Sequence, residues 1–149
     1  MPVTDELFLQ RCKAVLFTIV WIGCVIGLVN SVENTRAFLG SAVTAPGRVV
    51  ALNAGGSHPQ IEFVTRRGER VSYPQGGWIA GYKVGDKVNV LYLESSPRSS
   101  ATIDRVGAVW ELAIYFAFMS IVIPLIGLIN MTTKKLNRRS KAHRWKITE

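Results

Sequence analysis

The sequence predicts an α+β membrane protein in which two transmembrane helices flank a small antiparallel β-barrel-like domain of about five strands. Two uncharged apolar stretches, one near each end of the 149-residue chain, predict the helices. Short segments of alternating polarity, separated by turn-forming residues, predict the strands between them. The positive charge gathers at the C-terminal end, and this sets the expected orientation.

The chain combines a hydrophobic fraction of 48% with a formal net charge of +8, and it keeps the two properties apart. Residues 1–13 balance to zero, residues 33–111 carry nine basic and seven acidic side chains, and residues 132–149 have a net charge of +6. Cys12 and Cys24 lie in or beside the first apolar stretch. The middle segment therefore has no internal disulfide, and we interpret both cysteines as small apolar residues of a helix.

The apolar stretches are residues 14–32 and 112–131, nineteen and twenty residues without a charge. At a rise of about 1.5 Å per residue, each can cross a hydrocarbon core of about 30 Å. Each contains eleven Leu, Ile, Val or Phe residues, which favour insertion by about 3 to 7 kcal/mol. Both are apolar all round, which disfavours surface helices. A soluble chain of this length has too few other residues to bury two such helices.

The first stretch is interpreted as an uncleaved signal anchor rather than a cleaved signal peptide. Its N-terminal flank has mixed charge, whereas a signal peptide begins with a positive region. The small-residue pattern at Val43–Ala45 lies well beyond the stretch and is followed by Pro46, which is a poor residue after a cleavage site.

Positive residues at the edge of the second stretch predict that both termini are cytoplasmic and that the chain is a multi-pass protein of the cell (inner) membrane. The predicted segments are a cytoplasmic N-terminus, a first span, an extracytoplasmic β domain with its core at 45–104, a second span and a basic cytoplasmic tail, at residues 1–13, 14–32, 33–111, 112–131 and 132–149. The residues that set this orientation are Lys134, Lys135, Arg138, Arg139, Lys141, Arg144 and Lys146.

The basic tail has two further interpretations. Its cations can hold anionic lipid headgroups, with Trp145 in the membrane interface, at about 1 kcal/mol per cation. Nucleic-acid binding is disfavoured, because a tail this short has no fold of its own. Membrane lipid is therefore the expected partner of this segment.

Small residues suggest how the helices associate. Gly23 and Gly27 form a G-x-x-x-G pattern, and Ala113 and Ala117 repeat the spacing in the second span. Such residues let helix backbones approach in lipid. We favour packing of the two spans within one chain, and a homodimer through the first span is the alternative. Pro124 predicts a kink in the second span.

Neither span contains an Asp, Glu, Lys, Arg or His, which argues against a proton or ion path.

The middle segment shows strand patterns, and residues 33–45 connect it to the first span, with a helical extension of that span as one option. Gly47 and Gly68 are assigned to tight turns, and Gly85-Asp86 to a turn whose carboxylate bonds nearby amides. The segments 53–58 and 95–100 are expected loops. The predicted strands are 47–52, 60–65, 70–73, 87–93 and 101–104, with Phe63, Val88, Val90 and Tyr92 in the core.

The order of these motifs resembles the family called domain of unknown function 3592. Three blocks carry the resemblance: Ala45–Val50, His58–Thr65 with Gly68, and Tyr82–Tyr92 followed by Ser96-Pro97 and Ala101–Ile103. Ser96-Pro97 stands where the family more often has Asn-Pro. The resemblance covers about residues 45–104 and implies a membrane-anchored β domain, mostly bacterial, without a known activity.

No catalytic or metal-binding pattern is present, so we expect no enzyme activity and no cofactor. His58 is the one histidine expected outside, and it has no nucleophile motif beside it. Three or four ligands at zinc-site spacing are absent, and Gly55-Gly56 leads into a strand rather than a phosphate-binding helix.

Three hypotheses for function follow. The favoured one is a structural or protein-interaction module that presents its β domain outside the membrane. The alternative is an immunity-type protein that protects against a membrane-acting or periplasmic toxin, which would then be its partner. The third is an enzyme or channel subunit that uses Glu62, Asp86 and the Pro124 kink.

Overall fold

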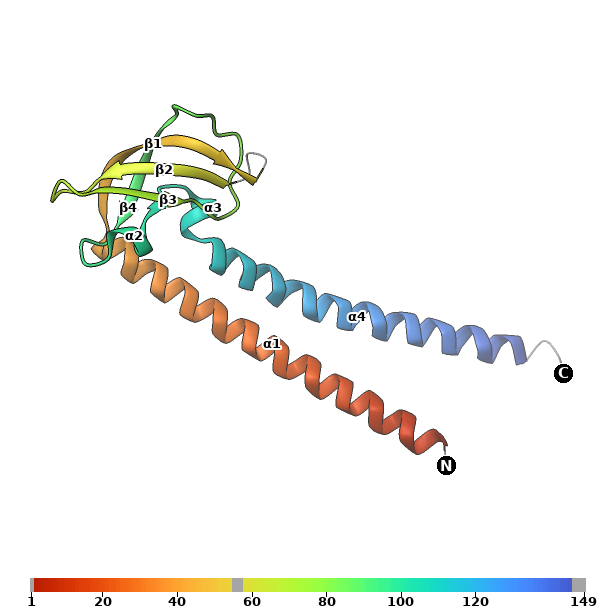
Figure 1. Ribbon diagram of the computed structural model, residues 1–149. Helices are drawn as coiled ribbons and strands as arrows, with labels where there is room; N and C mark the ends of the chain where they lie inside the picture. The colour runs from red at the N-terminus through yellow and green to blue at the C-terminus, as the bar shows by residue number, and fades with distance from the viewer. Residues whose placement is uncertain (1, 55–57, 146–149) are drawn as a thin grey trace. The chain divides into compact units, whose positions relative to one another are not determined.

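The computed structural model describes the backbone of residues 2–54 and 58–145, and the side chains of 7–54 and 58–137. A long helix precedes the group of strands along the chain, and a second long helix follows it (Figure 1). The elements are α1 Pro2–Ser41, β1 Val43–Asn53, β2 His58–Val64, β3 Arg70–Pro74, β4 Lys87–Tyr92, α2 Pro97–Ser100, β5 Thr102–Ile103, α3 Val106–Val109 and α4 Glu111–Trp145.

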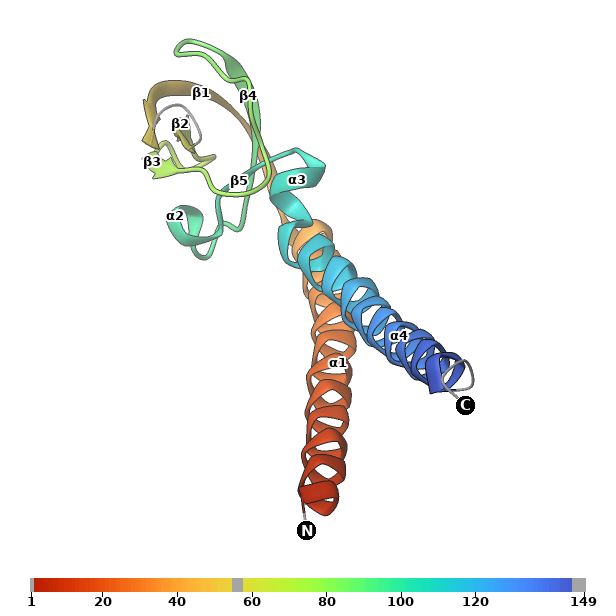
Figure 2. The same ribbon diagram turned by 90° about the vertical axis from the view of Figure 1, so that its right-hand side faces the viewer.

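The strands form one antiparallel sheet in the order β3-β2-β1-β4-β5. The eleven-residue strand β1 pairs with β4 along its first half and with β2 along its second half, and Gly47 pairs with both Phe63 and Val88. A bulge between Val49 and Ala51 bends β1, and the sheet curls (Figure 2). The predicted α+β class with five antiparallel strands is thereby confirmed.

The concave side of the sheet holds the core of the β domain. Its fully buried side chains include Val49, Ile61 and Val90. The Phe63 ring lies 5.0 Å from Tyr92 and 6.1 Å from Tyr73 between centroids, so the three aromatic rings pack as one group. Of the predicted core residues, Phe63, Val90 and Tyr92 are buried and Val88 is partly buried against them.

One buried glutamine joins the two edges of the sheet. Gln75 follows β3 and is 5% exposed. Its Oε1 accepts hydrogen bonds from the Ile103 N–H of β5 at 2.7 Å and from the Tyr73 hydroxyl at 3.0 Å. Its Nε2 donates to the Gly76 carbonyl at 2.8 Å and to Thr102 Oγ1 at 3.3 Å. The β3 and β5 edges are thus bridged by a side chain instead of a backbone ladder.

The same group buries the Tyr73 hydroxyl. Burial, and secondarily the electrostatic effect of the nearby Tyr82, raise the pKa of Tyr73 well above its usual range. Tyr73 therefore stays protonated at physiological pH and donates to Gln75.

The structure corrects two assignments and confirms that the connector extends the first helix. Gly47 lies inside β1 and not in a turn. A Cβ at this position would lie 2.7 Å from Val90 Cγ2 and 3.1 Å from the Glu62 carbonyl oxygen, so close packing requires the glycine. The expected loop at 95–100 contains the one-turn helix α2. Residues 33–41 continue α1, so the connector is helical almost to the first strand.

The other turn assignments fall where the backbone needs them. Gly68 and Gly85 have φ angles of +82° and +97°, which L side chains rarely adopt. Asp86 Oδ2 accepts a hydrogen bond of 2.8 Å from the Lys83 N–H and so closes the turn before β4. The predicted loop after Asn53 falls partly on residues 55–57, which lie outside the described residues.

The chain divides into two compact units, residues 28–114 and residues 1–27 with 115–149. In the second unit, Trp21 Nε1 donates a hydrogen bond of 2.9 Å to the Ser120 carbonyl. A Cβ on Gly27 would lie 2.7 Å from the Phe116 ring, whereas one on Gly23 would meet nothing within 4 Å. Gly27 therefore packs against the other helix of the same chain.

This contrast gives a matched pair of variants. We expect Gly27→Ile to destabilise the helix pair by about 1–3 kcal/mol, because the new side chain overlaps the Phe116 ring. Gly23→Ile should leave stability within about 0.5 kcal/mol of the parent chain. Thermal unfolding of the detergent-solubilised chain measures both. A Gly23→Ile variant that loses a dimer band on crosslinking would instead support association through the first span.

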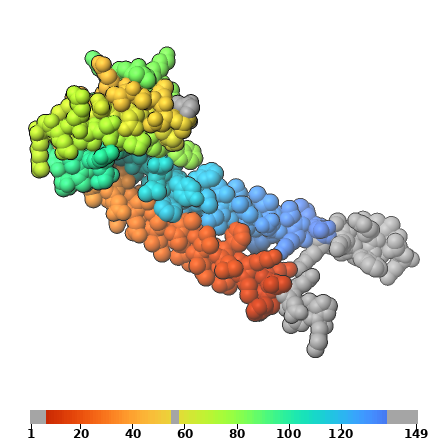
Figure 3. All heavy atoms as spheres, viewed as in Figure 1, coloured from red at the N-terminus to blue at the C-terminus, as the bar shows by residue number. Residues whose placement is uncertain are grey.

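Both long helices carry apolar stretches long enough to cross a membrane, at Leu7–Ser41 and Glu111–Asn137. In the most apolar 18-residue segment of α1 no residue is buried, and in that of α4 11% of the residues are buried. Large apolar side chains such as Leu16, Ile19 and Ile121 are more than half exposed along these helices. Figure 3 draws the heavy atoms of both helices as spheres, coloured by residue number.

Candidate functional site

The described residues of the β domain offer binding surfaces and no assembled catalytic group. No cluster of three or more His, Cys, Asp or Glu side chains that could hold a metal occurs among the residues the structure describes. Glu62 and Asp86, the two acids considered for an enzyme, line different hollows of the surface. The Asp86 carboxylate also accepts a hydrogen bond from the Lys83 N–H.

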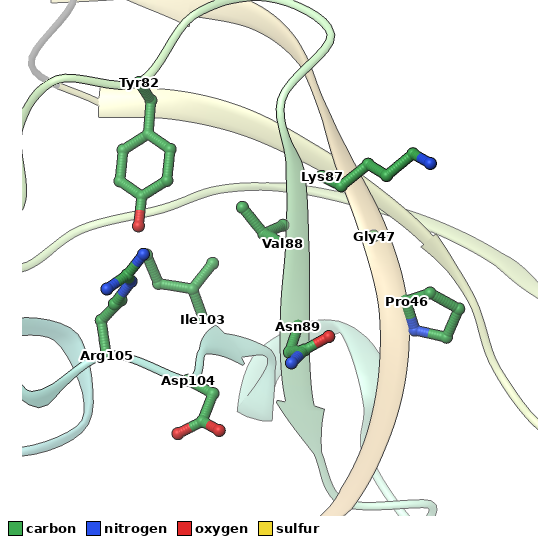
Figure 4. Close-up of a pocket in the computed structure, with 9 residues that line it drawn as sticks. All are labelled: Pro46, Gly47, Tyr82, Lys87, Val88, Asn89, Ile103, Asp104 and Arg105. Atoms are coloured by element: carbon green, nitrogen blue, oxygen red, sulfur yellow. The ribbon is translucent and has the colours of Figure 1, made fainter.

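The first hollow is a groove of about 340 Å³ beside β4. Figure 4 shows the Tyr82 ring and the Arg105 guanidinium pointing toward one another, with Val88 and Ile103 on the same side of β4. Lys87 extends to the opposite side of β4 in the same view. The groove is lined by Pro46, Gly47, Tyr82, Lys87, Val88, Asn89, Ile103, Asp104 and Arg105.

The second hollow, of about 310 Å³, lies on the outward side of the sheet. It is bordered by side chains from four strands, and two of them are apolar and exposed: Val50 at 37% and Val64 at 50%. Around them stand three cations and one acid, Glu62. We call this surface the basic face and define it by Arg48, Val50, Val64, Arg70 and Lys87.

The register of the sheet explains why the basic face is electrostatically unusual. Arg48 of β1 is directly opposite Lys87 of β4. On the other neighbouring strand, β2, Glu62 is the residue opposite Arg48. Like charges directly opposite one another destabilise a sheet. The ion pairs formed between described residues are Arg66–Glu94 and Arg67–Glu94, at 3.8 and 3.9 Å, so the cations of the basic face have no such partner there.

This arrangement suits an acidic protein surface. Exposed apolar side chains surrounded by charged ones are typical of protein–protein interfaces. Among the described residues, no carboxylate lies within ion-pair distance of Arg48 or Lys87. The two cations would therefore gain from a carboxylate that a partner places between them.

The chain is 44% identical over 115 residues to the "Immune protein Tsi4" of Pseudomonas aeruginosa, and the match covers 76% of this chain and 79% of the relative. The chain belongs to the Tsi4 family. No family model and no solved structure matches it, so the resemblance to domain of unknown function 3592 stays a prediction.

The other predicted residues of this Tsi4-family chain are placed as follows. Ala113 is buried and Ala117 is partly buried. Lys134 and Lys135 are exposed on α4, and Arg138, Arg139, Lys141 and Arg144 belong to the same helix, with side chains outside the described set. Lys146 lies outside the described residues.

Sequence patterns alone do not reveal the basic face of this Tsi4 relative. Alternation along each strand predicts that Arg48, Glu62 and Lys87 point outward, yet it does not say which strands are neighbours. The one sequence signal is that three predicted strands each carry a cation near a glycine, and the structure shows that a neighbouring strand approaches one of these glycines, Gly47, closely.

Proposed function

We propose that this chain is an immunity protein of the bacterial inner membrane, which protects its host from a toxin acting at the membrane or in the periplasm. The observation that carries the proposal is the 44% identity to a protein named as an immune protein, over three quarters of both chains. It favours the immunity hypothesis over a general interaction module. Protection by binding also requires no catalytic group or cofactor.

The exposed apolar helices support the membrane location. Leaving side chains such as Ile19 (59% exposed) and Ile121 (67% exposed) in water is unfavourable by about 25 cal/mol per Å², and many side chains of this kind line α1 and α4. Lipid removes that cost without any partner. The basic residues after the second span then favour cytoplasmic termini and a β domain on the outer side.

In this topology the β domain meets the toxin, and we assign the contact to the basic face. Its cations, which pair with no described carboxylate, attract an acidic surface and accelerate encounter. Val50 and Val64 supply apolar contact once the surfaces meet. The helices keep the domain where a toxin must arrive, and the basic tail fixes the orientation.

Competition between sister strains tests the proposed function. We expect a host lacking this gene to lose viability when grown in contact with its parent strain, because the parent still delivers the toxin. The full chain supplied on a plasmid should restore survival. The Gly23→Ile variant serves as a folded control, because a Cβ at this position meets nothing within 4 Å. It should restore survival as well as the parent chain does. Equal survival of the deletion strain and its parent under every contact condition would refute the proposal.

A further inference from the structure

The loop that follows β3 holds a tryptophan outward in a fixed position. Trp78 is 67% exposed, although the next residue, Ile79, packs against the core of the β domain. Ile79 therefore fixes the loop while Trp78 points to the surroundings. Large exposed aromatic side chains on an ordered backbone usually mark a contact surface.

Two glycines hold this loop against α3. The Trp78 N–H donates a hydrogen bond of 2.9 Å to the Gly107 carbonyl. A Cβ on Gly77 would lie 2.8 Å from the Gly107 oxygen, and Gly77 also has a φ of +98°. A Cβ on Gly107 would overlap the Trp78 carbonyl oxygen. The backbone of the loop lies in direct contact with the backbone of α3, and only glycine leaves room for this contact at either position.

The segment that the loop contacts leads directly into the second apolar stretch. Gly107 lies five residues before Leu112, where that stretch begins, a distance of about 8 Å at helical rise. Val106 beside it is 70% exposed. Tryptophan concentrates in the lipid headgroup region of a membrane. This region is about 6 Å thick on each side of the hydrocarbon core.

We infer that Trp78 and Val106 form a lipid-facing seat, by which the β domain rests on the outer leaflet of the membrane. Arg105, which shares a groove of about 650 Å³ with both, supplies a cation for lipid phosphates at the same level. The seat holds the domain at the membrane surface independently of any toxin. The inference rests on the membrane location proposed above and goes beyond it, because a domain on two helices can equally stand clear of the bilayer.

Depth-dependent fluorescence quenching tests the seat. The full chain carries Trp21, Trp78, Trp110 and Trp145. With the other three replaced by phenylalanine, Trp78 is the single emitter. In proteoliposomes we expect lipids brominated near the headgroup to remove most of its emission and aqueous iodide to remove little.

The matched control is Val84→Trp, in a chain whose own four tryptophans are phenylalanine. Val84 is 62% exposed and six residues further along the loop than Trp78. It does not line the groove that Trp78 shares with Val106. We therefore expect this emitter to respond to iodide alone.

Two results separate failure of the seat from failure of the membrane location. A Trp78 that iodide quenches and brominated lipid does not would overturn the seat. A chain with Trp21 as its only tryptophan should be quenched by deeply brominated lipid. If it is not, the membrane location fails as well. Should the triple replacement prevent folding, the difference in quenching between the parent chain and Trp78→Phe measures the same quantity.

Discussion

Lys87→Glu is expected to stabilise the β domain and to remove protection against the toxin. The new carboxylate would stand opposite Arg48, so a destabilising like-charge pair becomes a favourable cross-strand pair worth about 0.2–1 kcal/mol. The same change puts a negative charge into the basic face. Against an acidic partner we expect a loss of about 3 kcal/mol, or roughly 100-fold in affinity.

The opposite signs make this test specific. A variant that protects poorly because it misfolds would lose stability, whereas this one should gain it. Survival in the competition assay and urea unfolding of the solubilised chain are the two measurements. Arg98→Glu, at an exposed position of α2 away from the basic face, makes the same change in charge and should keep full protection. Full protection by Lys87→Glu would exclude this surface as the toxin contact.

Gln75→Leu should unfold the β domain more readily than any other single change outside its apolar core. Leucine keeps much of the side-chain volume but leaves the Ile103 N–H and the Tyr73 hydroxyl buried without an acceptor. Each such group costs about 1–3 kcal/mol, so we expect a loss of about 3–5 kcal/mol. That is a large share of the roughly 5–15 kcal/mol typical of folded domains.

Proteolysis of the solubilised chain in increasing urea measures this loss, because only the opened domain is cut. Gln60→Leu is the control: Gln60 also bonds side chains, Ser72 at 2.8 Å and Asn53 at 3.2 Å, but it is only half-buried and water can replace those partners. We expect it to cost less than about 1 kcal/mol. Equal midpoints for the two variants would show that Gln75 does not join the sheet edges.

Much of the fold follows from local patterns. The sequence predicts the strands β2, β3 and β4 to within about two residues, because each ends at Gly, Pro or a polar turn. Alternate side chains are buried along β2 and β3, whereas the last three residues of β4 are all buried. The two long apolar helices follow from composition. These features depend on residues that are close together in the sequence, so the sequence alone is enough to predict them.

Features that depend on distant neighbours are not predictable in this way. Gly47 resembles a turn residue because glycine usually is one, but its cause is the Val90 side chain of a strand some forty positions away. Gln75 resembles an ordinary polar loop residue until the Ile103 amide is placed beside it. The basic face likewise needs the register that sets Arg48 opposite Lys87. Pairing between strands, rather than strand formation, is the missing information.

The double pairing of β1 also bears on how the domain assembles during synthesis. β1, β2 and β3 are consecutive and can form a meander early, whereas β4 must return to β1 over a much longer loop and therefore pairs later. During that interval the half of β1 that awaits β4 is an open edge, available to other nascent chains. Pro46 stands in this half and has no N–H to offer, so the same strand that organises the sheet carries its own protection against aggregation.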